Sequence, residues 1–139
     1  QLGEYFSAVF SDYHLFEKLY GIDYKDKLDT VSEYMKKLQI DTKLSIQEDK
    51  FSTLNLSSGQ RKRLALLVTY LENRDVYFFD EWAAEQDPEF KKFFYEGLLP
   101  ELKAKGKCVI AITHDDRYFH LADKLIKMEL GNVVYKKVS

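Results

Sequence analysis

Cysteine and long apolar runs are scarce in this chain of 139 residues. The single cysteine, Cys108, excludes a disulfide framework, and its place inside an apolar run predicts a small core residue in a reducing compartment. No apolar run approaches the ~20 residues that a helix needs to cross a bilayer, and no signal peptide is recognisable. Any membrane attachment is therefore expected from another segment or another subunit.

An excess of positive charge is missing as well. The formal net charge is −2, so the sequence offers no basic surface for sequence-independent binding of nucleic acid. A phosphate-binding loop of the form G-x-x-x-x-G-K-[ST] is also absent, since the six glycines are scattered along the chain. Apolar residues make up 45% and aromatic residues 15% of the chain, which favours one packed domain over a disordered segment.

Periodic patterns in the first half predict helices. Apolar residues recur at near-helical spacing over 25–38, with Asp23 as a plausible cap, and residues 8–10 have extended character. The polar stretch 40–55 is expected to be a loop. Ser57 or Ser58 is predicted to cap a second helix, which Asn73-Arg74 ends and whose apolar face comprises Leu64, Leu67, Val68 and Leu71.

The second half alternates strands and helices. Continuous apolar runs at 75–80 and 107–113 predict two strands buried on both faces of a parallel sheet. Between them Asp87 is expected to cap a helix that Pro88 opens and that Pro100 kinks or restarts. These elements form one βαβ unit. A short helix near 116–121 and a hairpin with a Gly131-Asn132 turn are expected to follow.

Four short motifs follow one another between residues 56 and 115. In order, they are Leu56-Ser57-Ser58-Gly59-Gln60-Arg61, the run Val76-Tyr77-Phe78-Phe79 ending in Asp80-Glu81, Asp87-Pro88, and Ile112-Thr113-His114-Asp115. Each is weak alone, but this order is hard to obtain by chance. Together they resemble the signature motif, Walker B motif, D-loop and switch histidine of an ABC-type ATPase.

This resemblance implies an α/β fold, namely the C-terminal half of a P-loop (RecA-like) ABC ATPase core with an α-helical subdomain. Residues 12–74 would form the helical subdomain with the signature motif, and 75–139 the C-terminal part of the core. Because the phosphate loop is missing, residues 1–139 are expected to be a partial nucleotide-binding domain. This chain alone is expected to bind ATP poorly and not to turn it over.

The signature residues stand where a helix begins. Helix N-termini attract phosphate through backbone N–H groups and a partial positive charge. By resemblance, Ser57, Ser58, Gly59 and Gln60 contact the γ-phosphate of ATP held by the opposite subunit. Ser58 replaces the first glycine of the usual L-S-G-G-Q pattern. The alternative is an ordinary serine-capped amphipathic helix.

Asp80 and Glu81 follow a buried strand, where α/β folds bind ligands. Phosphoryl transfer uses Mg²⁺ to offset phosphate charge, and carboxylate oxygens suit that ion. By resemblance, Asp80 holds Mg²⁺, usually through water, and Glu81 acts as general base on the attacking water. The alternative is a solvated acidic pair at a strand end.

The resemblance assigns roles to three further residues. His114 would reach the γ-phosphate and position the water and Glu81, although a lone histidine at a strand end is more often structural. Asp87 would lie in the D-loop along the dimer interface, or serve only as a helix cap. Ser11 occupies the place of a metal-contacting glutamine. Serine is shorter than glutamine, which leaves two alternatives. Either Asp12 contacts the metal instead, or the metal contact at this place is dispensable.

Longer stretches narrow the resemblance. F-S-A-V-F-S-D-x-H-L-F, L-S-S-G-Q-R-K-R-L-A-L, D-E-W-A-A-E-Q-D-P-E-F and T-H-D-D-R-Y-F are similar to bacterial cyclic-peptide and siderophore-type ABC exporters, over residues 6 to about 135. The resemblance implies ATP and Mg²⁺ as cofactors and ATP-driven export of a peptide- or siderophore-like solute. It implies two partners, a second ABC ATPase domain and a transmembrane domain in the same polypeptide, and no nucleic acid. The expected location is the cytoplasmic face of the bacterial plasma (inner) membrane.

Two alternatives remain open on the sequence. A chromosome-maintenance (SMC) or repair-type ABC ATPase carries the same motifs, but no heptad segment precedes the signature here. A catalytically silent regulatory ABC domain would explain the departure at Ser11 and that in the D-loop, where only Asp87 of Ala84-Glu85-Gln86-Asp87 matches the usual S-A-L-D pattern. The intact Asp80, Glu81 and His114 argue against it.

Overall fold

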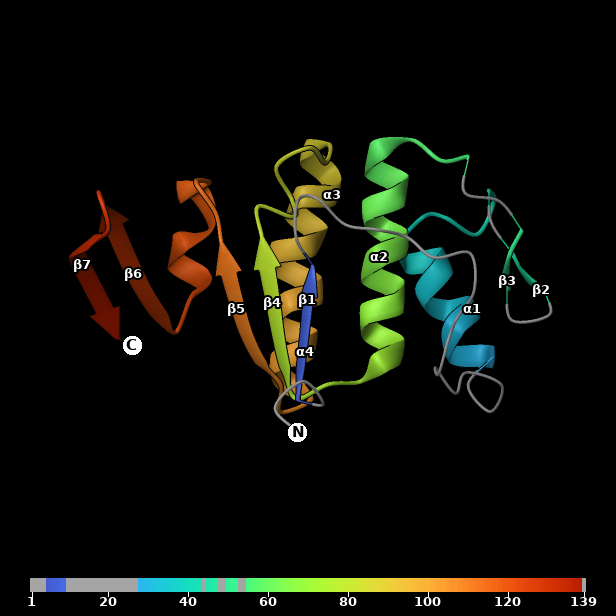
Figure 1. Cartoon of the computed structure of the whole chain (residues 1–139), viewed down its shortest axis with the longest axis horizontal. Helices are drawn as coiled ribbons and strands as arrows, with labels where there is room; N and C mark the ends of the chain where they lie inside the picture. The colour runs from blue at the N-terminus through green and yellow to red at the C-terminus, as the bar shows by residue number, and fades with distance from the viewer. Residues whose placement is uncertain (1–4, 10–27, 44, 48–49, 53–54, 139) are drawn as a thin grey trace.

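The computed structural model describes residues 5–9, 28–43, 45–47, 50–52 and 55–138. The expectations for Asp23, Ser11 and Asp12 lie outside these residues. A parallel sheet with strand order β1-β4-β5 forms the centre, and it comprises β1 (Phe6–Val9), β4 (Val76–Asp80) and β5 (Cys108–Ile112). The helices that connect β4 to β5 lie behind this sheet in Figure 1. The α/β class and the βαβ unit are thus confirmed, while the division at residues 74 and 75 stays a prediction.

The second helix, α2 (Ser58–Glu72), lies between the sheet and α1 (Leu28–Lys37), as Figure 1 shows. Ser57 is its N-cap, and Asn73 ends it in the left-handed conformation. The predicted apolar face of this helix is buried at Leu64, Leu67 and Leu71. The buried surface is wider than one stripe because α2 contacts elements on two sides; its other buried residues are Lys62, Arg63, Leu66, Thr69 and Tyr70.

The segment 40–55 is not simply a loop. It contains a small antiparallel hairpin of β2 (Ile46–Gln47) and β3 (Lys50–Phe51), so that prediction was wrong. Strands of two residues are too short to produce an alternating pattern in the sequence. Phe51 is buried in the core and anchors the hairpin.

One face of the central sheet is buried. On β4, Tyr77 and Phe79 are buried, whereas the alternate residues are only partly buried. The ring of Phe79 meets that of Phe94 edge-on, with centroids 5.3 Å apart. β5 is mostly exposed, so the prediction that both strands are buried on both faces was wrong for the described chain. Cys108 is exposed for the same reason and is not a core residue.

A π-helical turn interrupts the helix between β4 and β5. Asp87 caps α3 (Pro88–Phe93), the turn follows at Phe94–Leu98, and α4 (Leu99–Ala104) completes the element. Pro100 lies in the first turn of α4, directly after the π-helical turn, and has no N–H to donate back into that turn. A proline ring clashes with the carbonyl four residues before it, which accounts for the widened turn. The predicted restart at Pro100 is confirmed.

The chain ends in a 3₁₀ helix (Asp116–Leu121) and a hairpin of β6 (Lys124–Glu129) and β7 (Asn132–Val138). The hairpin turn is Leu130-Gly131, both with positive φ, so it lies one residue before the predicted position. Asn132 instead pairs with Glu129. No helix within the described ranges is long and apolar enough to cross a membrane.

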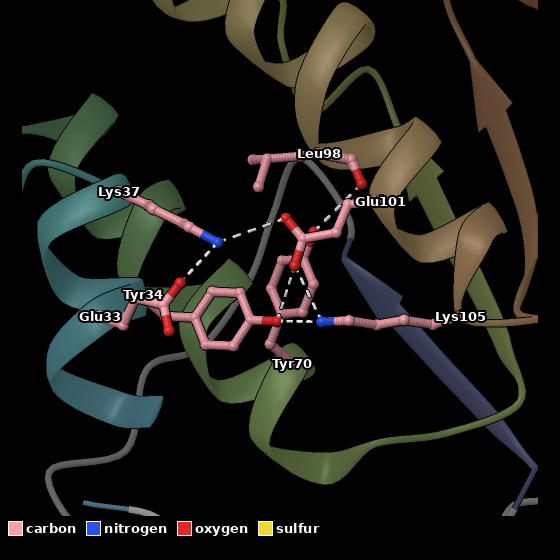
Figure 2. Close-up of polar contacts among 7 residues, drawn as sticks. All are labelled: Glu33, Tyr34, Lys37, Tyr70, Leu98, Glu101 and Lys105. Atoms are coloured by element: carbon pink, nitrogen blue, oxygen red, sulfur yellow. Dashed lines mark hydrogen bonds and ion pairs between the residues drawn. The ribbon is translucent and has the colours of Figure 1, made fainter. Parts of the chain in front are cut away.

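A polar cluster joins α1 to α4 (Figure 2). The Tyr34 hydroxyl donates to Glu101 Oε1 at 3.0 Å, and Lys105 Nζ donates to the same oxygen at 2.8 Å. Lys37 Nζ lies 3.6 Å from Glu101 Oε2. The Tyr34 ring stacks on Tyr70 of α2 with centroids 4.7 Å apart. Glu101 therefore accepts hydrogen bonds both from Tyr34 of α1 and from Lys105 at the end of its own helix.

Candidate functional site

Glu81 is the residue at which the chain leaves β4. Its N–H donates to the carbonyl of Ile112 at 3.1 Å, so the ladder between β4 and β5 continues one residue beyond Asp80. Its φ is 49°, in the left-handed region that residues with a Cβ rarely adopt. Such conformations are concentrated at functional sites, where the surrounding structure enforces them. The left-handed turn thus comes directly after the last residue of β4.

A cleft of about 430 Å³ opens beside this turn. Its walls come from the end of β4, from the helix behind the sheet and from the loop after β5: Glu81, Ala83, Ala84, Lys91, Tyr95, Thr113, His114, Asp115 and Asp116. Within it, His114 Nε2 lies 3.0 Å from Glu81 Oε1. The fold thus brings together the two residues that the sequence indicated as catalytic, although they are 33 positions apart.

Glu81 Oε1 is shielded from solvent but accepts no hydrogen bond from the residues that the structure describes. The short distance to His114 therefore reflects proximity without hydrogen-bond alignment. A buried carboxylate oxygen without a donor is unfavourable unless a ligand or water supplies one. This oxygen fits a group that accepts a proton from a reacting molecule in the cleft.

The loop that carries His114 is held by side chains on both sides. The Tyr95 hydroxyl donates to Thr113 Oγ1 at 2.8 Å, and the Asp115 N–H donates to the same oxygen at 3.1 Å. Burial raises the pKa of Tyr95, so its hydroxyl stays protonated and donates at neutral pH. Arg117 binds Asp115 through two hydrogen bonds, of 2.7 and 2.6 Å, and these hold the pKa of that carboxyl below its usual value.

Tyr95 was missed by the sequence interpretation. It lies in the π-helical turn and is buried beside Phe94, so in the sequence it resembles any other aromatic core residue. Only the hydrogen bond from its hydroxyl to Thr113 distinguishes Tyr95 from the other aromatic residues of the core. A π-helical turn is often found at functional sites, but the sequence marks this one only by Pro100.

The signature residues lie outside this cleft. Ser57 Oγ accepts from the Gln60 N–H at 3.2 Å, and Gln60 Oε1 accepts from the Ser57 N–H at 3.1 Å, which together form a capping box. The capping role predicted for Ser57 is confirmed. Ser58 and Gly59 fill the first turn of α2 between these residues. The cleft lining includes none of the four.

Asp87 combines two contacts. Its Oδ1 accepts from the Phe90 N–H at 2.9 Å, and its Oδ2 accepts from Arg63 Nη2 at 2.8 Å. The Phe90 hydrogen bond and the Arg63 charge hold the pKa of Asp87 below its usual value of 3.8. Its capping role is confirmed, and it also ties the start of α3 to α2.

The residues at the end of β4 fit Mg²⁺ chemically. Asp80 is half-buried there and offers a carboxylate. No cluster of three or more histidine, cysteine or acidic residues that could hold a metal occurs in the described part of the chain. A site of this kind suits Mg²⁺, which usually takes one or two carboxylates together with waters and phosphate oxygens. Ser11, the other predicted metal contact, lies outside the described residues.

The profile of the ABC transporter family matches residues 1–84. The chain belongs to the ABC transporter family. The ATP-binding protein SyrD of Pseudomonas syringae pv. syringae is 53% identical over 132 residues, which cover 93% of this chain and 23% of SyrD. The energy-coupling factor transporter ATP-binding protein EcfA1 of Mycoplasma genitalium is 39% identical over 80 residues, 58% of this chain and 29% of EcfA1.

The fold of this ABC transporter chain also matches a solved structure. A bacterial Atm1-family ABC exporter with ATP bound aligns with a TM-score of 0.74 over 99% of this chain and 26% of the exporter chain. The sequence identity is 21%, so this likeness concerns the fold. The chain therefore spans about a quarter of the length of these relatives.

Proposed function

We propose that this chain is the second half of the ATP-hydrolysing domain of an ABC exporter. The observation that carries the proposal is the cleft in which Glu81 and His114 approach to 3.0 Å from the ends of neighbouring parallel strands. The left-handed turn at Glu81, and its Oε1, which accepts no hydrogen bond from the described part of the chain, fit a carboxylate held ready for chemistry.

In this mechanism Glu81 accepts a hydrogen bond from the attacking water through Oε1 and draws its proton as general base. His114 lies beside that oxygen and orients the water toward the γ-phosphate. Tyr95 and Thr113 keep the His114 loop in place. Asp80 would hold Mg²⁺, which, when bound, offsets the charge of the β- and γ-phosphate oxygens.

The signature residues Ser57, Ser58, Gly59 and Gln60 act on a second ATP in this proposal. Their separation from the cleft supports an arrangement in which they serve the ATP of an opposing ABC domain. Asp87 would lie along the interface between the two domains. The partners would be that second domain and a transmembrane domain in the same polypeptide, at the cytoplasmic face of the bacterial inner membrane.

A peptide- or siderophore-like solute is the proposed cargo. The support is the resemblance of the sequence motifs to cyclic-peptide and siderophore-type exporters, which includes Trp82 at the position where most ABC ATPases carry proline. Trp82 is buried, stacks on Phe94 and donates to the Lys62 carbonyl at 3.2 Å. Trp82 therefore joins α2 to the π-helical turn of the helix behind the sheet.

The test is ATP turnover by the full-length protein. Glu81→Gln should lower turnover by about tenfold or more, since a general base typically contributes 10²–10⁴-fold. His114→Ala should also lower it, whereas His120→Ala, on the exposed 3₁₀ helix, should not. Undiminished turnover in Glu81→Gln would refute the role of this cleft. Tight DNA binding without solute-stimulated turnover would favour a chromosome-type ATPase instead.

A further inference from the structure

Gln86 is a buried polar residue for which the motif comparison gives no role. It lies one residue before Asp87, in the D-loop segment Ala84-Glu85-Gln86-Asp87, in which only Asp87 matches the family pattern. Only 6% of its surface is exposed. A buried amide is costly unless its oxygen and nitrogen are both hydrogen-bonded. The contacts that satisfy this amide therefore indicate what the residue does.

Both ends of the Gln86 amide contact α2. Its Oε1 accepts from Arg63 Nε at 3.0 Å, and its Nε2 donates to the carbonyl of Gly59 at 3.2 Å. A Cβ added to Gly59 would lie 3.6 Å from Gln86 Oε1, so the amide packs directly against the signature turn. One side chain of the D-loop thus fixes the backbone of the signature motif.

Arg63 fixes the position of the Gln86 side chain. It is 9% exposed, and its guanidinium lies 3.8 Å over the Phe90 ring. Besides Gln86, it donates to Asp87 Oδ2 at 2.8 Å and to Gln39 Oε1 at 3.2 Å. The fixed planar guanidinium cannot satisfy these partners in many orientations, so it sets the orientation of the Gln86 amide.

We infer that Gln86 is a positioning residue, which fixes the Gly59 backbone of the signature turn relative to the D-loop for action on the opposing domain's ATP. This rests on the proposed function. The first turn of α2 can bind phosphate only if its N–H groups point at the ligand. Small misplacement of such groups lowers rates strongly. Because the signature completes a site that already holds ATP, its misplacement affects turnover more than ATP binding.

The experiment is steady-state ATP hydrolysis by the full-length protein with Gln86→Met, which keeps the volume and removes both hydrogen bonds. We expect kcat to fall about tenfold while KM for Mg-ATP changes by less than about twofold. Gln86→Glu keeps an acceptor for Arg63 but cannot donate to the Gly59 carbonyl as a carboxylate. It should lower kcat similarly without lowering the unfolding temperature.

Gln39→Met is the matched control. It removes one Arg63 hydrogen bond by the same substitution but makes no change at Gly59, so kcat should stay within about twofold of wild type. An equal loss in Gln39→Met, or an unchanged kcat in both Gln86 variants, would overturn the positioning role. If turnover depends on Glu81 while the Gln86 variants are fully active, only this inference fails. If wild type shows no Glu81-dependent turnover, both proposals fail.

Discussion

The polar cluster between α1 and α4 predicts how firmly α1 is held. Glu101→Gln keeps the shape of the side chain and one acceptor but removes the negative charge. In the wild type, that charge faces Lys105 at 2.8 Å and Lys37 at 3.6 Å, and it accepts from Tyr34 of α1 (Figure 2). The substitution should therefore weaken the attachment of α1 without opening a cavity.

The expected loss follows from the burial of this carboxylate. Hydrogen bonds to charged groups contribute about 1.5–3 kcal/mol. The Glu101 side chain is 29% exposed, and glutamine retains an acceptor, so we expect a loss around or below the lower end of that range, about 1–2 kcal/mol. An effect of that size changes an opening equilibrium about 5- to 30-fold.

Amide hydrogen exchange of Leu28–Lys37 in the full-length protein measures this opening directly. Glu101→Gln should lower the protection of these amides about 5- to 30-fold. Glu33→Gln is the control, because Glu33 is 64% exposed and pairs only with Lys37 among the described residues, at 2.9 Å. Exposed pairs of this kind contribute about 0.5 kcal/mol or less. Equal protection in wild type and Glu101→Gln would refute the idea that the cluster holds α1.

The same cluster sets a pH dependence. Burial alone would raise the pKa of Glu101, but hydrogen bonds from Lys105 and Tyr34 outweigh it and hold the pKa below the usual 4.5. A carboxyl whose pKa is lower in the folded state stabilises that state above its unfolded pKa. The protection of α1 conferred by Glu101 should thus be complete at neutral pH and be lost as the pH falls below 4.5. Glu101→Gln should remove this dependence.

Two further substitutions test the framework around the site. Ser57→Ala removes the capping oxygen of α2 and should cost about 1 kcal/mol, seen as faster amide exchange in the first turn of that helix; unchanged exchange would contradict the capping box. Trp82→Ala should cost about 3–5 kcal/mol and lower the unfolding temperature, because the ring is 1% exposed and stacks on Phe94 with centroids 4.4 Å apart. Trp82→Phe should restore most of that loss.

Much of the fold could be predicted from the sequence because its signals are local. A serine before an amphipathic helix, a proline after an aspartate and an apolar run between polar residues each act within a few positions. The caps at Ser57 and Asp87 and the strand β4 were found in this way. Glu81 and His114 were indicated by resemblance to a family, and the fold places them together.

Burial and side-chain contact could not be predicted in the same way. The run around Cys108 is apolar enough for a strand with two buried faces, but the described helices cover one face of the sheet. Tyr95 supports the cleft through a hydrogen bond to Thr113, 18 positions away, and Gln86 contacts the signature helix through hydrogen bonds with Arg63 and Gly59, 23 and 27 positions away. Contacts of that range depend on the packed tertiary structure and leave no periodic pattern.

The capping box explains why the position of Gly59 matters to phosphate recognition. At the start of α2, the N–H groups of Ser57 and Gln60 already donate to each other's side chains. The Gly59 N–H is not used in those two bonds, and its missing side chain lets a phosphate approach the backbone. On the other side of the same residue, Gln86 holds the carbonyl. The D-loop thus holds Gly59, the residue of the signature turn whose N–H lies outside the capping box, and links the two motifs through this one residue rather than through the whole helix.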